Sequence, residues 1–187
     1  MQEEVNMLYE IAQESMDKAV THLGNELLKI RTGKASAAMV SGISVDYYGS
    51  ATPLAQVANV GTSDAKTITI QPWEKSMIPI IEKAIFEANL GLTPQNDGEM
   101  VRLVVPPLTE ERRRDLVKKA KALGEEAKVG VRGARQKAMD SIKKAVKDGY
   151  PEDAGKRAEH NVQEFTNSFG KRIDDILKKK EDDIMTV

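Results

Sequence analysis

The chain has 187 residues, 40% of them hydrophobic and 30% charged, with 28 Lys/Arg, 29 Asp/Glu and no cysteine. This is the composition of a globular protein of one or two domains, and it excludes disulfides and thiolate metal sites. No apolar run approaches the roughly 18 residues of a membrane-spanning helix. The acidic start, Met1–Glu4, continues into a helical pattern and does not resemble a signal peptide. We therefore expect a cytoplasmic protein without a membrane segment.

Residues 1 to about 31 carry apolar side chains at helical spacing, beginning with Val5 and Leu8 and ending with Leu27 and Ile30. Steps of three and four residues predict an amphipathic helix with one buried stripe. Gly33 follows closely, in the position of a C-terminal cap.

Between about residues 34 and 105 the pattern changes to short alternating segments separated by turns. Alternation over 43–47 and 66–71 predicts strands, and 61–64 is expected to be the turn of a hairpin between 57–60 and 66–71. Residues 76–89 are predicted to form a short amphipathic helix, and 100–105 a final strand. This segment is therefore expected to be a small β/α/β domain.

The run from Thr109 to Lys147 is predicted to form one long helix and carries most of the positive charge. It holds 13 Lys/Arg and 6 Asp/Glu, whereas the rest of the chain holds 15 and 23. A basic helix on an otherwise acidic body indicates an anionic partner that meets one face. Three glycines interrupt the helix, and a close helix contact explains only Gly130, which lies near the apolar stripe.

One flank of this helix collects cations. Arg114, Lys121, Lys128 and Arg135 recur every seven residues, and Arg132 falls within about 60° of them beside the apolar stripe. The spacing allows a solvated face, in which the stems of Lys and Arg cover the edge of the core. It equally allows phosphate binding, which the charge asymmetry favours.

The residues around these cations indicate which kind of anion they would bind. Aromatic residues make up 4% of the chain and none interleaves with the basic flank, which argues against a single-strand stacking platform. A rigid helix with spaced cations suits a folded, duplex-rich RNA recognised by shape. Arg132 and Arg135 are the best candidates, because a guanidinium can bind phosphate through two hydrogen bonds.

After a break at 148–151, residues 152–185 give a third amphipathic helix. Each helix has one apolar stripe to bury, which predicts an elongated antiparallel three-helix bundle from residues 1–31 and 106–187. Residues 32–105 then form an inserted domain, and the fold class is α+β. The two segments that connect the bundle with the inserted domain are predicted to act as a hinge, formed by Thr32, Gly33, Val105, Pro106 and Pro107.

Catalytic patterns are absent from the sequence. His22 and His160 lie on different predicted helices and are more readily explained as surface residues than as bases. There is no cysteine nucleophile, glycine-rich phosphate loop or HExxH motif. The pairs 174–175 and 182–183 diverge on a helix, as in a solvated face rather than a metal site. We expect no enzyme activity, no cofactor and no metal.

Several stretches resemble bacterial ribosome recycling factor, in order along nearly the whole chain. They are 29–36 (KIRTGKAS), 47–49 (YYG), 82–85 (EKAI), 90–94 (LGLTP), 106–113 (PPLTEERR), and Val131-Arg132 followed by Arg135. The resemblance implies an L-shaped monomer whose small domain sits on a flexible neck. It implies binding to 23S rRNA of the large ribosomal subunit after termination, and splitting of the ribosome with elongation factor G and GTP.

By this resemblance Arg31, Arg132 and Arg135 contact rRNA, and the small domain faces elongation factor G and the small subunit. The full candidate set for rRNA binding is Arg31, Arg114, Lys121, Lys128, Arg132 and Arg135. Gly133 and Gln136 depart from the family's usual Asn and Arg. Two alternatives remain open: a general RNA-binding helical protein, which predicts a broadly basic surface, and an enzyme with its substrate site in the small domain.

Overall fold

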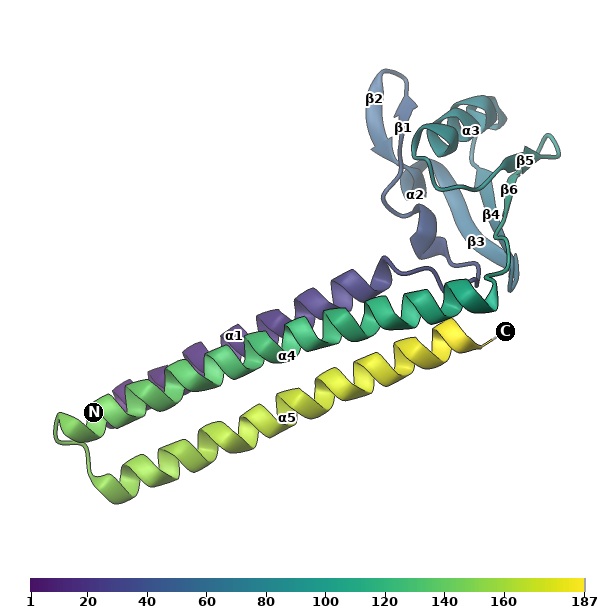
Figure 1. Ribbon diagram of the computed structural model, residues 1–187. Coiled ribbons are helices and arrows are strands. Elements are labelled where there is room, and N and C mark those ends of the chain that lie inside the picture. Colours follow the sequence, from purple (N-terminus) through teal and green to yellow (C-terminus); the bar gives the residue numbers. More distant parts are fainter. Residues whose placement is uncertain (187) are drawn as a thin grey trace. The chain divides into compact units, whose positions relative to one another are not determined.

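The computed structural model describes residues 1–186, which form two compact units (Figure 1). The first comprises Met1–Arg31 with Glu110–Thr186, and the second comprises Thr32–Thr109. Residues 106–109, which the sequence analysis assigned to the bundle, therefore group with the inserted unit. The predicted α+β class, a helical bundle with an inserted small domain, is confirmed.

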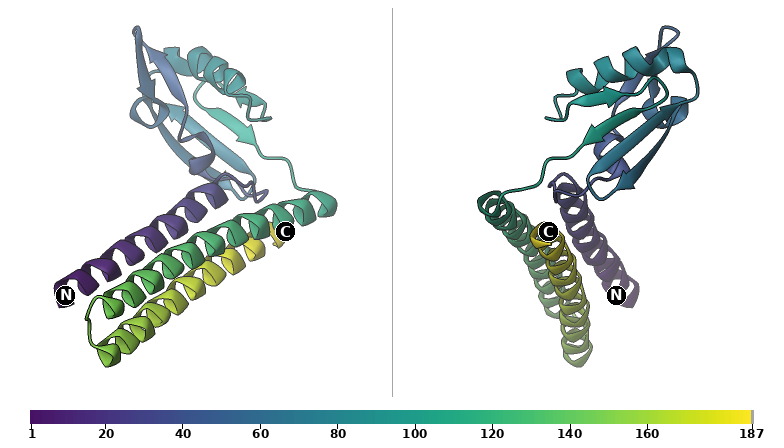
Figure 2. Two further views of the ribbon diagram at one scale, coloured as in Figure 1. Left: turned by 60° about the vertical axis from the view of Figure 1, so that its left-hand side comes forward. Right: turned by 90° about the vertical axis from the view of Figure 1, so that its right-hand side faces the viewer.

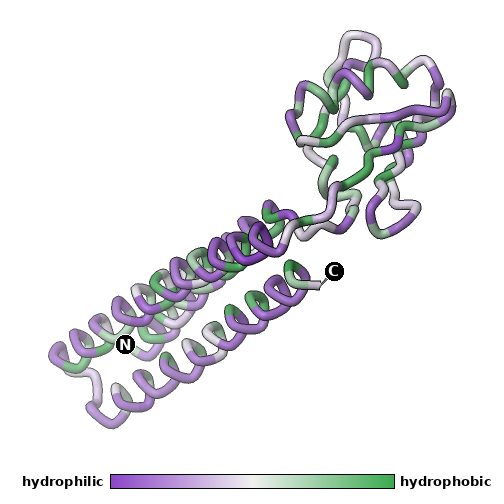
Figure 3. The backbone as a smooth tube through the Cα atoms, turned by 45° about the vertical axis from the view of Figure 1, so that its right-hand side comes forward, coloured by the Kyte–Doolittle hydropathy of each residue, from purple (hydrophilic) through white to green (hydrophobic). Residues whose placement is uncertain are grey.

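The first unit is an antiparallel bundle of α1 (Gln2–Leu28), α4 (Glu110–Lys147) and α5 (Glu152–Met185). The chain direction of α4 is opposite to that of α1 and α5, and α4 packs against both (Figures 1 and 2). Hydrophobic and hydrophilic residues alternate along each helix with the expected period (Figure 3). The predicted stripes are buried, and their largest fully buried members are Met16, Leu23, Ile142, Ile173 and Ile184.

The first helix ends earlier than predicted. Its last residue is Leu28, and Lys29 closes it in a right-handed conformation. Gly33, expected to be the cap, lies five residues beyond Leu28 and has a φ of +77° in the connecting segment. The other long helices have the predicted bounds, and the turn between them uses a φ of +107° at Gly149.

Arg113 of α4 caps the C-terminal end of α5. Its side chain is buried, and Nη1 donates hydrogen bonds to the backbone oxygens of Ile184 at 2.6 Å and Thr186 at 3.0 Å. The last carbonyls of a helix lack intrahelical partners, and a cation there is favoured by the helix dipole. One of the cations that make α4 basic therefore has a structural role.

The glycines of α4 differ in their surroundings. A Cβ at Gly124 would lie 2.2 Å from Cδ1 of Leu177, so α4 and α5 approach closely there only because Gly124 has no side chain. At Gly130 a Cβ would lie 3.4 Å from the Ala19 Cβ, which agrees with the predicted helix contact. At Gly133 a Cβ would meet nothing within 4 Å. The contact at Gly124 was missed by the sequence analysis.

Alanine at two of these glycines is expected to have opposite effects. Gly124→Ala forces Leu177 aside and should lower the free energy of unfolding by about 1–3 kcal/mol. Gly133→Ala removes backbone freedom from the unfolded chain and causes no clash in the folded one. It should therefore raise the free energy of unfolding by about 0.5–1 kcal/mol. Urea unfolding of the two variants measures this difference, and changes of the same sign would contradict it.

The inserted unit contains two antiparallel sheets and a helix. The two-stranded sheet pairs β1 (Ser44–Tyr47) with β2 (Ser50–Pro53). The larger sheet has the order β3-β4-β6-β5, with bounds Ala58–Asp64, Thr67–Pro72, Val101–Val104 and Pro94–Asn96. The helical segments are η1 (Ala37–Val40), α2 (Leu54–Val57), η2 (Lys75–Met77) and α3 (Ile78–Glu87).

The core of this unit follows the predicted alternation, with Ile68 and Ile70 of β4 packed with Ile81 and Ile85 of α3. The hairpin turn, however, was predicted too early, because β3 continues to Asp64. The Asp64 carboxylate accepts hydrogen bonds from the backbone N–H of Lys66 at 2.8 Å and from the Thr67 hydroxyl at 3.2 Å. These bonds form the turn at 65–66, and the bond from Lys66 is the main reason why the pKa of Asp64 is lowered.

Candidate nucleic-acid interface

A groove runs between α4 and α5 on the bundle. It consists of two adjoining hollows of about 440 and 410 Å³, both lined by Lys128 and Asp174. We call it the cationic groove and define it by its charged residues, Lys121, Glu125, Lys128, Arg132, Lys171, Asp174, Lys178 and Glu181. Five cations face three carboxylates, so the groove carries an excess of positive charge.

Arg135 is oriented by α5 beside this groove. Its Nε donates a hydrogen bond to Gln163 Oε1 at 2.8 Å, and Gln163 Nε2 donates to Asn167 Oδ1 at 2.7 Å. Asn167 itself lines the groove. Within residues 1–186 the terminal nitrogens of Arg135 make no further hydrogen bond that would occupy them. The guanidinium is thus held through one nitrogen, and its other two are available to an oxyanion.

Lys128 is the most strongly paired of the predicted cations. Its Nζ lies 2.8 Å from Asp174 and 4.0 Å from Glu125, and the side chain is 35% exposed. The hydrogen bond to Asp174 raises the pKa of Lys128 above its ordinary value of 10.5. The stability gained from this pair, at most about 1 kcal/mol, is therefore complete at neutral pH and is lost only as the pH rises through the raised pKa. Because Lys128 is already paired with Asp174, its ammonium is less available to an outside anion than the other predicted cations are.

Arg132, Arg114 and Lys121 are more open. Arg132 is 65% exposed with its nearest carboxylate, Glu125, at 4.0 Å, and Arg114 is 69% exposed and paired with Glu110 at 2.5 Å. Lys121 is exposed and forms no ion pair with any residue between 1 and 186. Pairs at this exposure are worth about 0–1 kcal/mol, so a phosphate can replace the carboxylate at little cost.

The structure does not bring every predicted cation together. Lys121, Lys128 and Arg132 line the groove and Arg135 adjoins it. Arg114 lies in the first turns of α4, outside both hollows. Arg31 is half-buried, three residues beyond the end of α1, and it lines neither hollow.

Two groove cations were missed, Lys171 and Lys178 of α5, together with the Gln163 that orients Arg135. Positions 163, 167, 171, 174 and 178 follow helical spacing beside the apolar stripe of α5, so their common flank could have been found. Which of them meet α4 depends on the register between the two helices, and the sequence pattern does not specify it.

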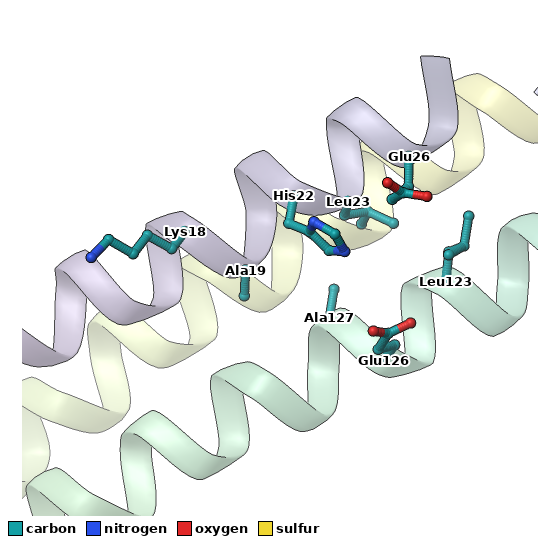
Figure 4. A pocket seen from close by; sticks show the side chains of 8 residues that line it. All are labelled: Lys18, Ala19, His22, Leu23, Glu26, Leu123, Glu126 and Ala127. Atoms are coloured by element: carbon teal, nitrogen blue, oxygen red, sulfur yellow. The ribbon is translucent and has the colours of Figure 1, made fainter. Parts of the chain in front are cut away.

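The bundle has another hollow, on the flank of α4 that meets α1. A hollow of about 310 Å³ lies between α1 and α4, where Glu26 and Glu126 accompany Lys18 and His22 (Figure 4). Two carboxylates and one lysine give this hollow no cationic excess. The pKa of Glu26 is lowered, chiefly by its hydrogen bond with Lys29.

The predicted hinge residues are not equivalent. Val105 is buried in the core of the inserted unit, and its N–H donates to the Lys66 oxygen at 2.7 Å. Pro106 and Pro107 are exposed, and Thr32 and Gly33 are half-buried. A Cβ at Gly33 would lie 3.3 Å from Leu108 Cγ, so the two connecting segments run close together.

No helix within residues 1–186 is both long and apolar enough to cross a membrane. No group of three or more His, Asp or Glu side chains in the same range could hold a metal ion.

Fold and groove together define a two-unit α+β protein in which a small domain interrupts a three-helix bundle with a cationic interhelical groove. A family model described as "Ribosome recycling factor" matches residues 23–185. The chain belongs to the ribosome recycling factor family, and with it to the translation factors.

Individual relatives agree along their whole length. The chain is 52% identical over 187 residues to the ribosome-recycling factor of Flavobacterium johnsoniae, with 100% of both chains covered. A solution structure of the ribosome recycling factor has a TM-score of 0.82 at 39% identity, covering 98% of each chain. A second match, with a TM-score of 0.66 at 38% identity, covers 97% of this chain and 99% of the other. It belongs to models of the T. thermophilus ribosome recycling factor and the E. coli elongation factor G bound to the E. coli post-termination complex.

Proposed function

We propose that this protein binds the post-termination ribosome and, with elongation factor G and GTP, splits it into subunits and releases it from mRNA. The observation that carries this proposal is the family match over residues 23–185. It is supported by the likeness, at 38% identity, to a recycling factor described together with elongation factor G on the post-termination complex.

The bundle is proposed to meet the 23S rRNA of the large subunit through the cationic groove. Fixed cations displace the counterions condensed on RNA, and this release drives binding. Arg132 is open and Arg135 is pre-oriented, so these two are assigned the strongest phosphate contacts. Lys121 adds to the groove, Arg31 and Arg114 extend the contact beyond it, and Lys128 contributes least.

The connecting segments are proposed to let the inserted unit change direction during recycling. Val105 is fixed in the core of that unit, so the pivot is assigned to Thr32, Gly33, Pro106 and Pro107. Small or cyclic residues at the ends of elements are where domain hinges commonly occur. The inserted unit would then face elongation factor G and the small subunit.

The protein is proposed to act as a cytoplasmic monomer and not as an enzyme, the energy coming from GTP hydrolysis by elongation factor G. The alternative is a general RNA-binding helical protein. The charge distribution favours the first, because the excess of cations is confined to residues 109–147, and the rest of the chain carries more carboxylates than cations. A general binder would hold free duplex RNA as tightly as large subunits.

Incubation of purified post-termination ribosomes with this protein, elongation factor G and GTP tests the proposal. Subunits separated on a sucrose gradient should accumulate only when both factors and GTP are present. Large subunits should also bind far more tightly than free duplex RNA. Splitting no greater than with elongation factor G alone would overturn the proposed activity. Equal affinity for large subunits and for free duplex RNA would favour the alternative.

A further inference from the structure

The inserted unit has a pocket in which three aromatic residues lie with a carboxylate. The hydroxyls of Tyr47 and Tyr48 donate to the two oxygens of Glu74, at 2.9 and 2.8 Å. Tyr47, Trp73 and Glu74 line a hollow of about 330 Å³. The two tyrosine rings pack edge to face, with centroids 4.7 Å apart. We call these four residues the aromatic–acidic pocket.

Two of the three aromatic residues of this pocket are exposed to solvent. Tyr48 is 80% exposed and Trp73 is 68% exposed. Tyr48 has a φ of +50° and is followed by Gly49 at +86°, so the β1–β2 turn holds a bulky residue in a conformation that such residues rarely adopt. An exposed large aromatic surface and an unfavourable backbone conformation in one turn are features that point to binding.

The chemistry of the pocket selects a cation. The faces of Trp and Tyr rings attract positive charge, and a carboxylate that accepts two hydrogen bonds retains lone pairs for further donors. The hydrogen bonds to Glu74 raise the pKa of both Tyr47 and Tyr48, so the hydroxyls remain donors at neutral pH. The nearest lysine in sequence, Lys75, lies 3.6 Å from Glu99 in an ion pair of its own.

We propose that the aromatic–acidic pocket receives an arginine side chain from a partner protein. A planar guanidinium stacks on an aromatic face and can donate two parallel hydrogen bonds to a carboxylate, which a lysine ammonium cannot do. Residues 32–109 carry five Lys/Arg and seven Asp/Glu, so the unit as a whole favours a basic protein. Nucleic acid is disfavoured, because Glu74 repels phosphate beside the rings on which a base would stack.

Trp73 is the only tryptophan in the chain, so its fluorescence reports on this pocket alone. The probe is the peptide acetyl-Gly-Arg-Gly-amide, and its control carries citrulline, which has the same shape without charge. The arginine peptide should change Trp73 emission saturably, with a Kd of about 1–10 mM, as expected for one exposed cation–π contact with a charge-assisted hydrogen bond. The citrulline peptide should give no saturable change.

Two glutamine variants test whether binding depends on the carboxylate in the pocket or on the overall negative charge of the unit. Glu74→Gln should weaken the arginine peptide at least about 10-fold, because it removes the carboxylate and keeps the shape. Glu87→Gln, which removes an exposed carboxylate of α3, should leave its binding unchanged. Equal responses to arginine and citrulline, or an unchanged Kd in Glu74→Gln, would overturn the proposal. A saturable response to hexauridylate but not to arginine would replace it with a nucleic-acid surface.

Discussion

Arg113→Ala is expected to lower the free energy of unfolding by about 2–4 kcal/mol. The variant removes a buried guanidinium that donates to the backbone oxygens of Ile184 and Thr186. The Ile184 carbonyl would lose a charged donor at a buried site, where water cannot replace it fully, and the Thr186 carbonyl would lose one at a partly buried site. The loss should appear in urea unfolding followed by circular dichroism at the helical signal.

The neighbouring residue supplies the matched control. Arg114 belongs to the same turn of α4 and carries the same charge, but it is exposed and paired with Glu110 on the surface. Arg114→Ala should cost no more than about 0.5 kcal/mol. Arg113→Lys should fall between the two, because an ammonium keeps the charge without the planar fork. Equal losses in the two alanine variants would mean that Arg113 does not hold the end of α5.

The helical part of the fold could be predicted because each long helix has a single apolar stripe with an unbroken period. The bounds of α4 and α5 follow from such stripes, together with the break at 148–151 between them. The inserted unit was less readable. Strands β2 and β5 were missed because they are short and mostly exposed, so no apolar alternation marks them.

The candidate site could be predicted only in outline. Spacing put Lys128 and Arg135 on one flank of α4, but it did not reveal that Asp174 neutralises Lys128 or that Gln163 orients Arg135. Both facts depend on which residues of α5 lie beside which residues of α4. Arg113 and Arg114 show the same limit. These consecutive arginines of α4 look alike in the sequence, but Arg113 is buried against the end of α5 and Arg114 is exposed.

The double variant Arg132→Ala/Arg135→Ala is expected to lose about 100-fold or more in affinity for large ribosomal subunits. A charge-assisted hydrogen bond is worth about 1.5–3 kcal/mol, which corresponds to roughly 10-fold or more for each arginine. Removing two phosphate contacts should also lower the slope of log affinity against log salt by about 1.4–1.8. Neither substitution should affect folding, because Arg132 is exposed and Arg135 is only half-buried.

The matched control is Lys137→Ala/Lys144→Ala, which removes the same charge from exposed positions of α4 outside the groove. The decisive measurement is the affinity of the wild type and both double variants for purified large subunits across a salt series. The predicted result is a large loss of affinity and a shallower salt slope in the arginine variant, with much smaller changes in the lysine variant. Equal losses in the two variants would contradict the assignment, because binding would then depend on total charge and not on the groove between α4 and α5.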